Sequence, residues 1–164
     1  QILNEGHTSV DALQGSWAGA MGQTQFMPIS FLNYAVDYDG DGKKDIWGTE
    51  ADVFASIANY LSSEGWNNKG TWGRQVKLSG AVPFSGLAKA NMKPLSFWKQ
   101  NGVTRFDGSA LPNVDINAAL IMPDGEDGRI YLVYDNFHTL MKWNRSSYFG
   151  ISVGYLSERI KRGY

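Results

Sequence analysis

Gly15-Ser16-Trp17-Ala18-Gly19-Ala20-Met21-Gly22-Gln23-Thr24-Gln25-Phe26-Met27-Pro28 is the stretch of sequence that decides how this chain is interpreted. Three of its first eight residues are glycine, which makes an isolated helix unstable. Small residues allow two backbone segments to approach closely, so the stretch favours a tightly packed loop and the start of a helix. We therefore expect it to pack against a neighbouring helix.

The composition indicates a globular domain without a nucleic-acid partner. Hydrophobic residues make up 43% of the 164 residues, enough to bury a core. Lys and Arg number 15 against 16 Asp and Glu, and the net charge of −1 lacks the basic face that phosphate binding requires. There is no cysteine, which excludes disulfides and a thiol nucleophile. His7 and His138 are too few and too scattered for a zinc site.

Helical patterns dominate the first third of the chain, up to about Gly65. A short apolar pattern predicts a helix over 30–36. Thr49 and Asp52 have the spacing of a capping box, and apolar residues then recur at helical spacing. A second helix is therefore expected to follow Thr49 and to end at Gly65.

Short β-prone runs separated by turn signals follow from about Trp72 to Tyr134. The clearest strands are 75–78 and 130–134, and a helix is expected near 94–101. The chain ends in a helix over 146–161 whose apolar residues recur at helical spacing, namely Phe149, Val153, Leu156 and Ile160. Helical stretches on both sides of a small antiparallel sheet define an α+β architecture.

Residues 37–45 read Asp-Tyr-Asp-Gly-Asp-Gly-Lys-Lys-Asp, which matches the opening half of a calcium-binding loop. Asp37, Asp39 and Asp41 alternate so that their carboxylates can converge on one cation, and the Lys43 carbonyl can add a further oxygen. The twelfth position is glycine, so the closing acidic residue is displaced, and Asp52 could close a longer loop. Alternatively, the Asp-Gly pairs only form turns and Asp52 only caps the following helix.

The stretch from Gly15 to Pro28 resembles the hallmark of the lytic murein transglycosylase B family, whose domain is related to goose-type lysozyme. Segments 34–37, 46–47, 56–61, 65–66, 136–137 and 143–146 are similar to the family in the same order. The resemblance therefore covers almost the whole chain.

The resemblance implies a lysozyme-like, mainly helical core with a small antiparallel β lobe. It also implies non-hydrolytic cleavage of the bond between N-acetylmuramic acid and N-acetylglucosamine. One glutamic acid protonates the leaving oxygen and then accepts the proton of the muramic 6-hydroxyl, which gives a 1,6-anhydro end. One carboxyl suffices because the substrate supplies the nucleophile, and apolar surroundings raise its pKa. The chemistry requires no cofactor.

By the same resemblance, the substrate-binding positions are Ser16, Gln25, Phe26, Tyr60, Asn144 and Tyr148. Core packing is the alternative interpretation of Phe26 and Tyr60. The family's calcium loop corresponds to Asp37, Asp39, Asp41, the Lys43 carbonyl and Asp52, and is one residue longer here. A structural Ca²⁺ is therefore the one ion implied. Trp143 stands where the family commonly has tyrosine, which keeps a stacking surface.

The catalytic glutamate has no counterpart in the chain. In the family it lies in a Gly-x-Glu segment well upstream of Gly15, whereas Glu5 lies in the turn just before that stretch. Glu50 and Glu64 flank the second helix and are expected to be solvated. Because Gln1 is an unusual start and residues 1–4 look like a helix end, we expect the chain to begin mid-protein. The acid would then belong to an N-terminal portion of the same protein, which would be a partner of this chain.

The sequence thus predicts three parts. Residues 1–70 are the helical part of a lysozyme-like core with the Asp-rich loop, residues 71–135 are the β lobe, and residues 136–164 are a C-terminal helix that returns to the core.

Three functions remain open at this point. The first is a lytic transglycosylase that acts on peptidoglycan glycan strands, in the periplasm or at the outer membrane of a bacterial cell envelope. The second is a non-catalytic peptidoglycan-binding fragment or module. The third is a calcium-stabilised structural domain, which would bind no sugar.

Overall fold

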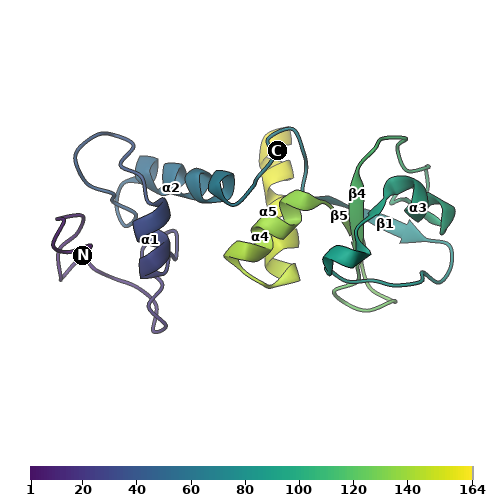
Figure 1. Ribbon diagram of the computed structural model, residues 1–164, viewed down its shortest axis with the longest axis horizontal. Coiled ribbons are helices and arrows are strands. Elements are labelled where there is room, and N and C mark those ends of the chain that lie inside the picture. Colours follow the sequence, from purple (N-terminus) through teal and green to yellow (C-terminus); the bar gives the residue numbers. More distant parts are fainter. Residues whose placement is uncertain (164) are drawn as a thin grey trace. The chain divides into compact units, whose positions relative to one another are not determined.

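The computed structural model describes residues 1–163, which divide into two units after Gly65 (Figure 1). The first unit holds two helices, α1 (Pro28–Tyr34) and α2 (Glu50–Ser63). Proline suits the first turn of α1 because the missing N–H would have no helical partner there. Phe31 of α1 and Val53 and Tyr60 of α2 are buried. Both helices expected in the first third of the sequence are confirmed.

The capping box predicted for α2 is wrong. Thr49 is the N-cap residue, but its side chain makes no capping hydrogen bond. The Thr49 hydroxyl donates instead to Asp45 (3.2 Å), and both carboxylate oxygens of Asp52 accept from loop backbone. Hydrogen bonds to the preceding loop have replaced the local cap.

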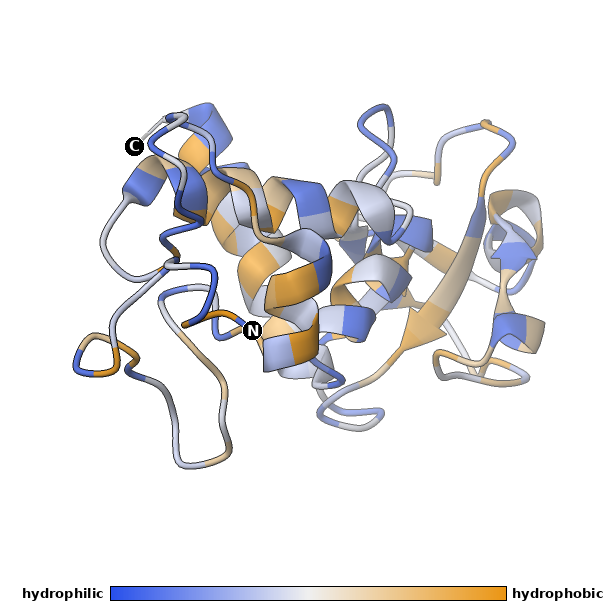
Figure 2. Cartoon of the chain, turned by 60° about the vertical axis from the view of Figure 1, so that its left-hand side comes forward, coloured by the Kyte–Doolittle hydropathy of each residue, from blue (hydrophilic) through white to orange (hydrophobic). Residues whose placement is uncertain are grey.

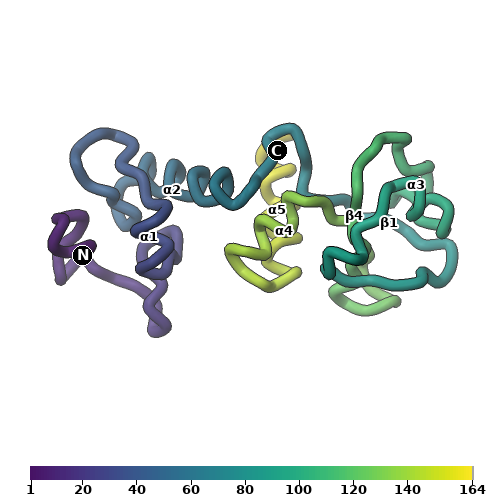
Figure 3. The backbone as a smooth tube through the Cα atoms, viewed as in Figure 1, coloured from purple at the N-terminus to yellow at the C-terminus, as the bar shows by residue number. Residues whose placement is uncertain are grey.

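Residues 1–27 form no regular helix, as the purple part of the tube shows (Figure 3). The expected helix end at residues 1–4 is a hydrogen-bonded turn, with the Glu5 N–H donating to the Gln1 carbonyl (2.9 Å). The stretch that begins at Gly15 is a folded loop held by bridges between Gly15 and Met21 and between Met21 and Phe26. A Cβ atom on Gly15 would lie 2.5 Å from the Ala20 carbonyl oxygen, so the loop requires glycine there.

The second unit contains a five-stranded sheet of order β2-β4-β5-β1-β3, with every pair antiparallel. The strands are β1 (Gly73–Leu78), β2 (Lys93–Pro94), β3 (Val103–Arg105), β4 (Asn117–Ile121) and β5 (Ile130–Val133). The short helices η1 (Lys89–Asn91) and α3 (Leu95–Gln100) precede and follow β2. The strands expected at 75–78 and 130–134 and the helix near 94–101 are confirmed.

The core of this unit is built on the two central strands. All four residues of β5 and four of the five residues of β4 are buried. Figure 2 shows these strands coloured mostly as apolar, whereas the helices carry bands of both kinds. Trp98 of α3 is fully buried, and its indole N–H donates to the Ala118 carbonyl (2.8 Å). The α3 helix is thereby fixed to the sheet.

Two further helices, α4 (Asp135–Trp143) and α5 (Ser147–Arg162), complete the second unit. The α5 helix begins where expected, and the Ser146 hydroxyl caps it by accepting from the Phe149 N–H (3.3 Å). Its buried residues are Gly150 and Gly154, whereas Leu156 and Ile160 are 53% and 64% exposed. The helix therefore packs through its small residues and not through its apolar stripe.

No helix among residues 1–163 has the length and apolarity needed to span a bilayer. The division of the sequence into the parts 1–70, 71–135 and 136–164 remains a prediction beside the two units described above.

Candidate functional site

A pocket of about 1080 Å³ opens in the first unit. Its wall comes from three segments, residues 6–16, 22–25 and 43–48. Two of the predicted substrate-binding residues, Ser16 and Gln25, lie in this wall. The structure therefore brings the Gly15 loop together with the segment that leaves the Asp-rich loop.

Ser16 is held by its own loop. Its backbone N–H donates to the Ala20 carbonyl (2.7 Å), and its hydroxyl oxygen accepts from the Ala20 N–H (3.2 Å). A serine hydroxyl is both donor and acceptor, so its hydrogen remains available to a further acceptor. Ser16 can thus offer an O–H donor to a ligand from a held oxygen.

Gln25 has an unusual backbone conformation. Its φ of 53° is the one positive value among the described residues that are not glycine. The side-chain amide donates to the Gly22 carbonyl (2.9 Å), which leaves the amide oxygen as an acceptor. Strained backbone of this kind concentrates at functional positions. Gln25 therefore presents a fixed acceptor in the same wall as the Ser16 hydroxyl.

Trp47 and Gln23 also form part of the wall. The Trp47 indole N–H donates to the Gln14 carbonyl (2.8 Å), and its ring lies 5.7 Å from that of Phe31. Gln23 donates twice to successive carbonyls, from its backbone to Ile46 (2.8 Å) and from its side chain to Trp47 (2.9 Å). Polar groups and an aromatic ring therefore line one pocket, a combination that suits a carbohydrate.

Among the described residues, Asp45 is the one carboxylate in the pocket wall. It accepts from the backbone N–H groups of Trp47 and Gly48, both at 2.9 Å. Partial burial raises the pKa of Asp45, but the hydrogen bonds from Gly48, Trp47 and Thr49 outweigh it, and the pKa lies below its ordinary value. Asp45 is consequently a structural anion and a poor proton donor.

His7 joins the N-terminal segment to the pocket wall. Its Nδ1 accepts from the Lys44 N–H (3.2 Å), and its Nε2 lies 3.3 Å from the Glu5 carboxylate. The ring also packs 5.6 Å from Phe31. These contacts hold residues 6–9 against the segment that leaves the Asp-rich loop.

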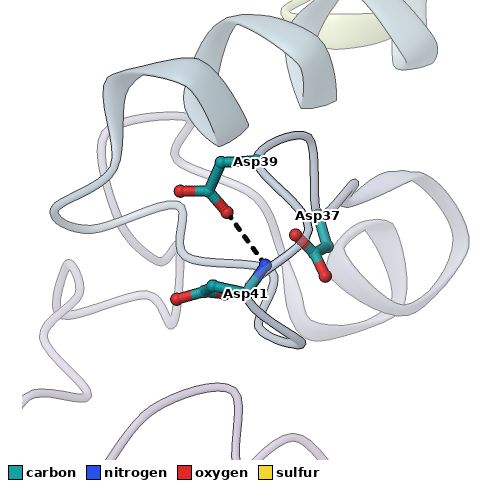
Figure 4. Close-up of side chains that lie close together, drawn as sticks. All are labelled: Asp37, Asp39 and Asp41. Carbon is teal, nitrogen blue, oxygen red and sulfur yellow. Dashed lines mark hydrogen bonds between the residues drawn. The ribbon is translucent and has the colours of Figure 1, made fainter.

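The Asp-rich loop gathers three carboxylates. One oxygen from each of Asp37, Asp39 and Asp41 lies within 4.8 Å of the others (Figure 4). Asp37 accepts from the N–H groups of Gly40 (2.7 Å) and Gly42 (2.9 Å), which shapes the loop around its first carboxylate. Oxygen donors that converge in this way fit a hard divalent cation such as Ca²⁺.

Lys43 lies in the loop next to these carboxylates, and Asp52 lies in the first turn of α2. The Lys43 N–H donates to the Asp41 carboxylate (2.8 Å), and Lys43 also lines the pocket. Asp52 is 1% exposed and accepts from Tyr38 at the loop entry and from Asp45 at its exit, both at 2.8 Å. Asp52 therefore joins the two ends of the loop, and ligation by Asp52 and by the Lys43 carbonyl remains a prediction.

Phe26 and Tyr60 lie in the core of the first unit. They are 3% and 8% exposed, and their rings lie 5.9 Å apart. Burial raises the pKa of Tyr60, with a smaller contribution from the charge of Glu64. Neither residue lines the pocket, which favours the packing interpretation over direct sugar contact.

Asn144 and Tyr148 belong to the second unit. Asn144 is exposed between α4 and α5, and its side chain accepts from the Ser146 N–H (3.0 Å). The Tyr148 hydroxyl donates to Asp124 (2.7 Å), and this bond to a carboxylate raises the pKa of Tyr148. Sugar binding by these two residues remains a prediction.

Gln23, Asp45 and His7 were not among the predicted site residues. The bonds of Gln23 and His7 join segments 20 to 40 residues apart, and those of Asp45 hold an irregular turn, so that no local pattern reveals them. One feature of the sequence hinted at the contact of Gln23 with Ile46 and Trp47. Residues 15–28 and 46–47 both belong to the segments that resemble the same family.

A polar pocket, a carboxylate loop and a small antiparallel sheet on a helical framework characterise a lysozyme-like α+β domain. The family model for the transglycosylase SLT domain matches residues 1–158, and the chain belongs to this family. The resemblance inferred from residues 15–28 and the predicted fold class are thereby confirmed.

Individual relatives agree with this assignment. Membrane-bound lytic murein transglycosylase B of Escherichia coli (strain K12) is 30% identical over 148 residues, which are 90% of this chain and 40% of that protein. The structure of SltB3 from Pseudomonas aeruginosa in complex with NAG-anhNAM-pentapeptide matches with a TM-score of 0.91 at 43% identity, over 99% of this chain and 44% of that chain.

A third relative carries an ion. The structure of Escherichia coli lytic transglycosylase Slt35 in complex with calcium matches with a TM-score of 0.74 at 30% identity. The match covers 89% of this chain and 45% of that chain. The present chain thus spans less than half the length of each of these relatives.

Proposed function

We propose that this chain is the sugar-binding part of a peptidoglycan lytic transglycosylase that cleaves the bond between N-acetylmuramic acid and N-acetylglucosamine. The observation that carries the proposal is the pocket that unites Ser16 and Gln25 in a member of the transglycosylase SLT domain family. The NAG-anhNAM-pentapeptide in the similar SltB3 structure supports peptidoglycan as the ligand. A bacterial cell-envelope location follows from this substrate, on the periplasmic side or at the outer membrane.

The catalytic acid is proposed to lie N-terminal to Gln1. Among the described residues, the pocket wall holds Asp45 but no glutamate. A general acid for glycoside cleavage needs a raised pKa, whereas that of Asp45 is lowered. In the proposed reaction the absent glutamic acid protonates the glycosidic oxygen as the C1–O bond breaks. It then takes the 6-hydroxyl proton as O6 bonds to C1, which leaves the acid protonated again.

A non-catalytic peptidoglycan-binding fragment is the second candidate, favoured by the lack of a glutamate in the described pocket wall. Both candidates include a structural Ca²⁺ held by Asp37, Asp39 and Asp41, with the Lys43 carbonyl and Asp52 as further ligands. The calcium in the similar Slt35 structure supports this ion.

Two measurements test the proposal. Isothermal titration with tri-N-acetylchitotriose should show binding that Ser16→Ala and Gln25→Gly each weaken about tenfold. Digestion of purified peptidoglycan, followed by mass spectrometry, should give 1,6-anhydro ends only when the chain carries its upstream portion. Anhydro products from the 164-residue chain alone would place the acid inside it, and a wild-type chain that binds neither sugar nor peptidoglycan would contradict both candidates.

A further inference from the structure

The pocket wall and the Asp-rich loop share one backbone segment, residues 45–48. This segment leaves the loop at Asp45 and lines the pocket at Asp45, Trp47 and Gly48. It approaches the turn formed by residues 22–25 so closely that a Cβ atom on Gly22 would lie 2.6 Å from the Ile46 carbonyl oxygen. Any displacement of the segment therefore also displaces the turn that carries Gln25.

A continuous chain of hydrogen bonds runs from the loop into the pocket. The buried Asp52 accepts from the Asp45 N–H (2.8 Å), and the Asp45 carboxylate accepts from the Trp47 N–H (2.9 Å). The Ile46 and Trp47 carbonyls then accept from the backbone and side chain of Gln23, at 2.8 and 2.9 Å. Gln23 is thus the connection between the loop exit and the turn.

The turn itself depends on an external support. Gln25 lies two residues after Gln23 and holds a φ of 53°, which a non-glycine residue adopts only when its surroundings enforce it. Within the turn, the Gln25 N–H and side chain both donate to the Gly22 carbonyl, at 3.2 and 2.9 Å. The backbone bond from Gln23 to Ile46 holds this turn at one point, and the side-chain bond from Gln23 to Trp47 fixes its orientation on the loop exit.

We propose that Gln23 is a positioning residue that holds the Gln25 turn on the exit of the Asp-rich loop and thereby couples cation binding in the loop to sugar binding in the pocket. The inference rests on the proposed function, since it needs the pocket to bind an N-acetylated amino-sugar oligosaccharide. Gln23 acts through Gln25 and the pocket wall. The coupling is reciprocal, so the sugar must tighten Ca²⁺ binding by the same factor as Ca²⁺ tightens sugar binding.

The test is a set of isothermal titrations of the full 164-residue chain with tri-N-acetylchitotriose, in millimolar Ca²⁺ and in EDTA. For the wild type we expect about fivefold tighter sugar binding with Ca²⁺, within the usual range of allosteric coupling. Gln23→Met keeps the length of the side chain but removes its N–H donors, and should bring the ratio of the two dissociation constants close to one. Gln23→Lys restores a donor and should restore part of the ratio.

Gln100→Met is the matched control, because Gln100 is exposed at the end of α3 in the second unit. It should leave the ratio unchanged. Circular dichroism and the melting temperature of Gln23→Met establish that the variant is folded, and Ca²⁺ titration without sugar shows that its loop still binds the ion. A purely structural role for Gln23 would weaken sugar binding equally in Ca²⁺ and in EDTA.

The outcomes separate the inference from the proposed function. If the wild type binds the sugar and Ca²⁺ with independent affinities, or if Gln23→Met keeps the full ratio, the inference is wrong and the proposed function stands. If the wild type binds peptidoglycan but not the trisaccharide, the inference is wrong and the proposed function stands. If it binds neither under either condition, both are overturned.

Discussion

At the residue scale, Gln25 combines a candidate sugar contact with a left-handed backbone. Left-handed φ costs an L-residue about 1 kcal/mol, a cost that glycine avoids. We expect Gln25→Gly to be more stable than Gln25→Ala by about 1 kcal/mol, because both lose the side-chain hydrogen bond but only alanine keeps the strain. Urea unfolding of the two variants measures this difference.

The same pair of variants separates stability from binding. Both should bind tri-N-acetylchitotriose about tenfold more weakly than the wild type, because the amide oxygen is absent from each. An alanine variant as stable as the glycine variant would show that the turn relaxes and that the φ of 53° holds no strain.

His138 gives a second prediction at this scale. Burial on α4 lowers the pKa of His138, and the nearby charge of Asp135 only partly opposes the effect. Its Nε2 lies 3.4 Å from the Met92 sulfur. The folded chain therefore binds a proton at His138 less readily than the unfolded chain does. The free energy of unfolding is at its full value above the unfolded pKa near 6.5, where the histidine is neutral in both states. Stability should fall as the pH drops from that value through the lower folded pKa.

His138→Gln removes this titration. Free energies of unfolding at pH 7.5 and 5.5 should therefore differ less for the variant than for the wild type. An equal difference for both chains would mean that His138 does not contribute to the pH dependence.

At the element scale, α5 shows why side-chain pattern and packing can disagree. Gly154 lies against the Trp72 ring, and a Cβ atom there would overlap the indole. Trp72 is 5% exposed, and its N–H donates to Glu158 (3.1 Å), which also pairs with Arg74, so the ring cannot easily withdraw. Gly154 thus allows α5 to pack closely on Trp72, and the Glu158 carboxylate, one turn further along, binds the Trp72 indole.

Gly154→Ala should destabilise the chain despite a better helix propensity. Alanine gains about 1 kcal/mol over glycine within a helix, whereas overpacking a core costs about 1–3 kcal/mol. Because the added Cβ would lie only 2.4 Å from the indole, we expect the upper part of the overpacking range and a net loss of up to about 2 kcal/mol in the free energy of unfolding. Gly80→Ala, where no atom lies within 4 Å of the added Cβ, is the control and should be nearly neutral. A stabilised Gly154→Ala variant would contradict the close packing of α5 on Trp72.

Helices and strands with a regular apolar pattern could be predicted from the sequence. Elements that form because of their neighbours in the fold could not. The α2 and α5 helices and strands β1 and β5 follow from apolar spacing that is visible locally. The α4 helix was missed because it follows β5 almost directly and its N-cap, Tyr134, has no capping side chain. The β4 strand was missed because its alanines carry little strand preference. In the site, the Asp-rich loop could be predicted from the spacing of its aspartates. The hydrogen bonds of Gln23 and Asp52 could not, because they join segments that only the folded chain brings together.

At the scale of the whole molecule, the two units differ in what should stabilise them. The Asp-rich loop belongs entirely to the first unit, so a bound Ca²⁺ should stabilise that unit selectively. At a free concentration one hundred times its dissociation constant, the ion adds about 2.7 kcal/mol to the unit that binds it. Hydrogen exchange with and without Ca²⁺ should show slower exchange in α2 and the loop, with β4 and β5 unchanged.

The double variant Asp39→Asn, Asp41→Asn should lose this Ca²⁺ effect, because amides replace two of the three converging carboxylates. Asp115→Asn, an exposed position in the second unit, is the control and should retain it. Equal Ca²⁺ protection in the double variant would show that the ion binds elsewhere.

The loop that begins at Gly15 carries a tryptophan whose fluorescence can be followed. Trp17 at its tip is 100% exposed, whereas Trp72 and Trp98 are 5% and 0% exposed. Fluorescence from the tip should therefore lie at long wavelength and be quenched by iodide at low concentration, while the two buried indoles keep emitting at shorter wavelength. Because Trp47, Trp66 and Trp143 are also partly exposed, the Trp17 signal is taken as the difference between the wild type and Trp17→Phe. Iodide quenching of that difference reports whether a glycan strand or another protein covers the loop.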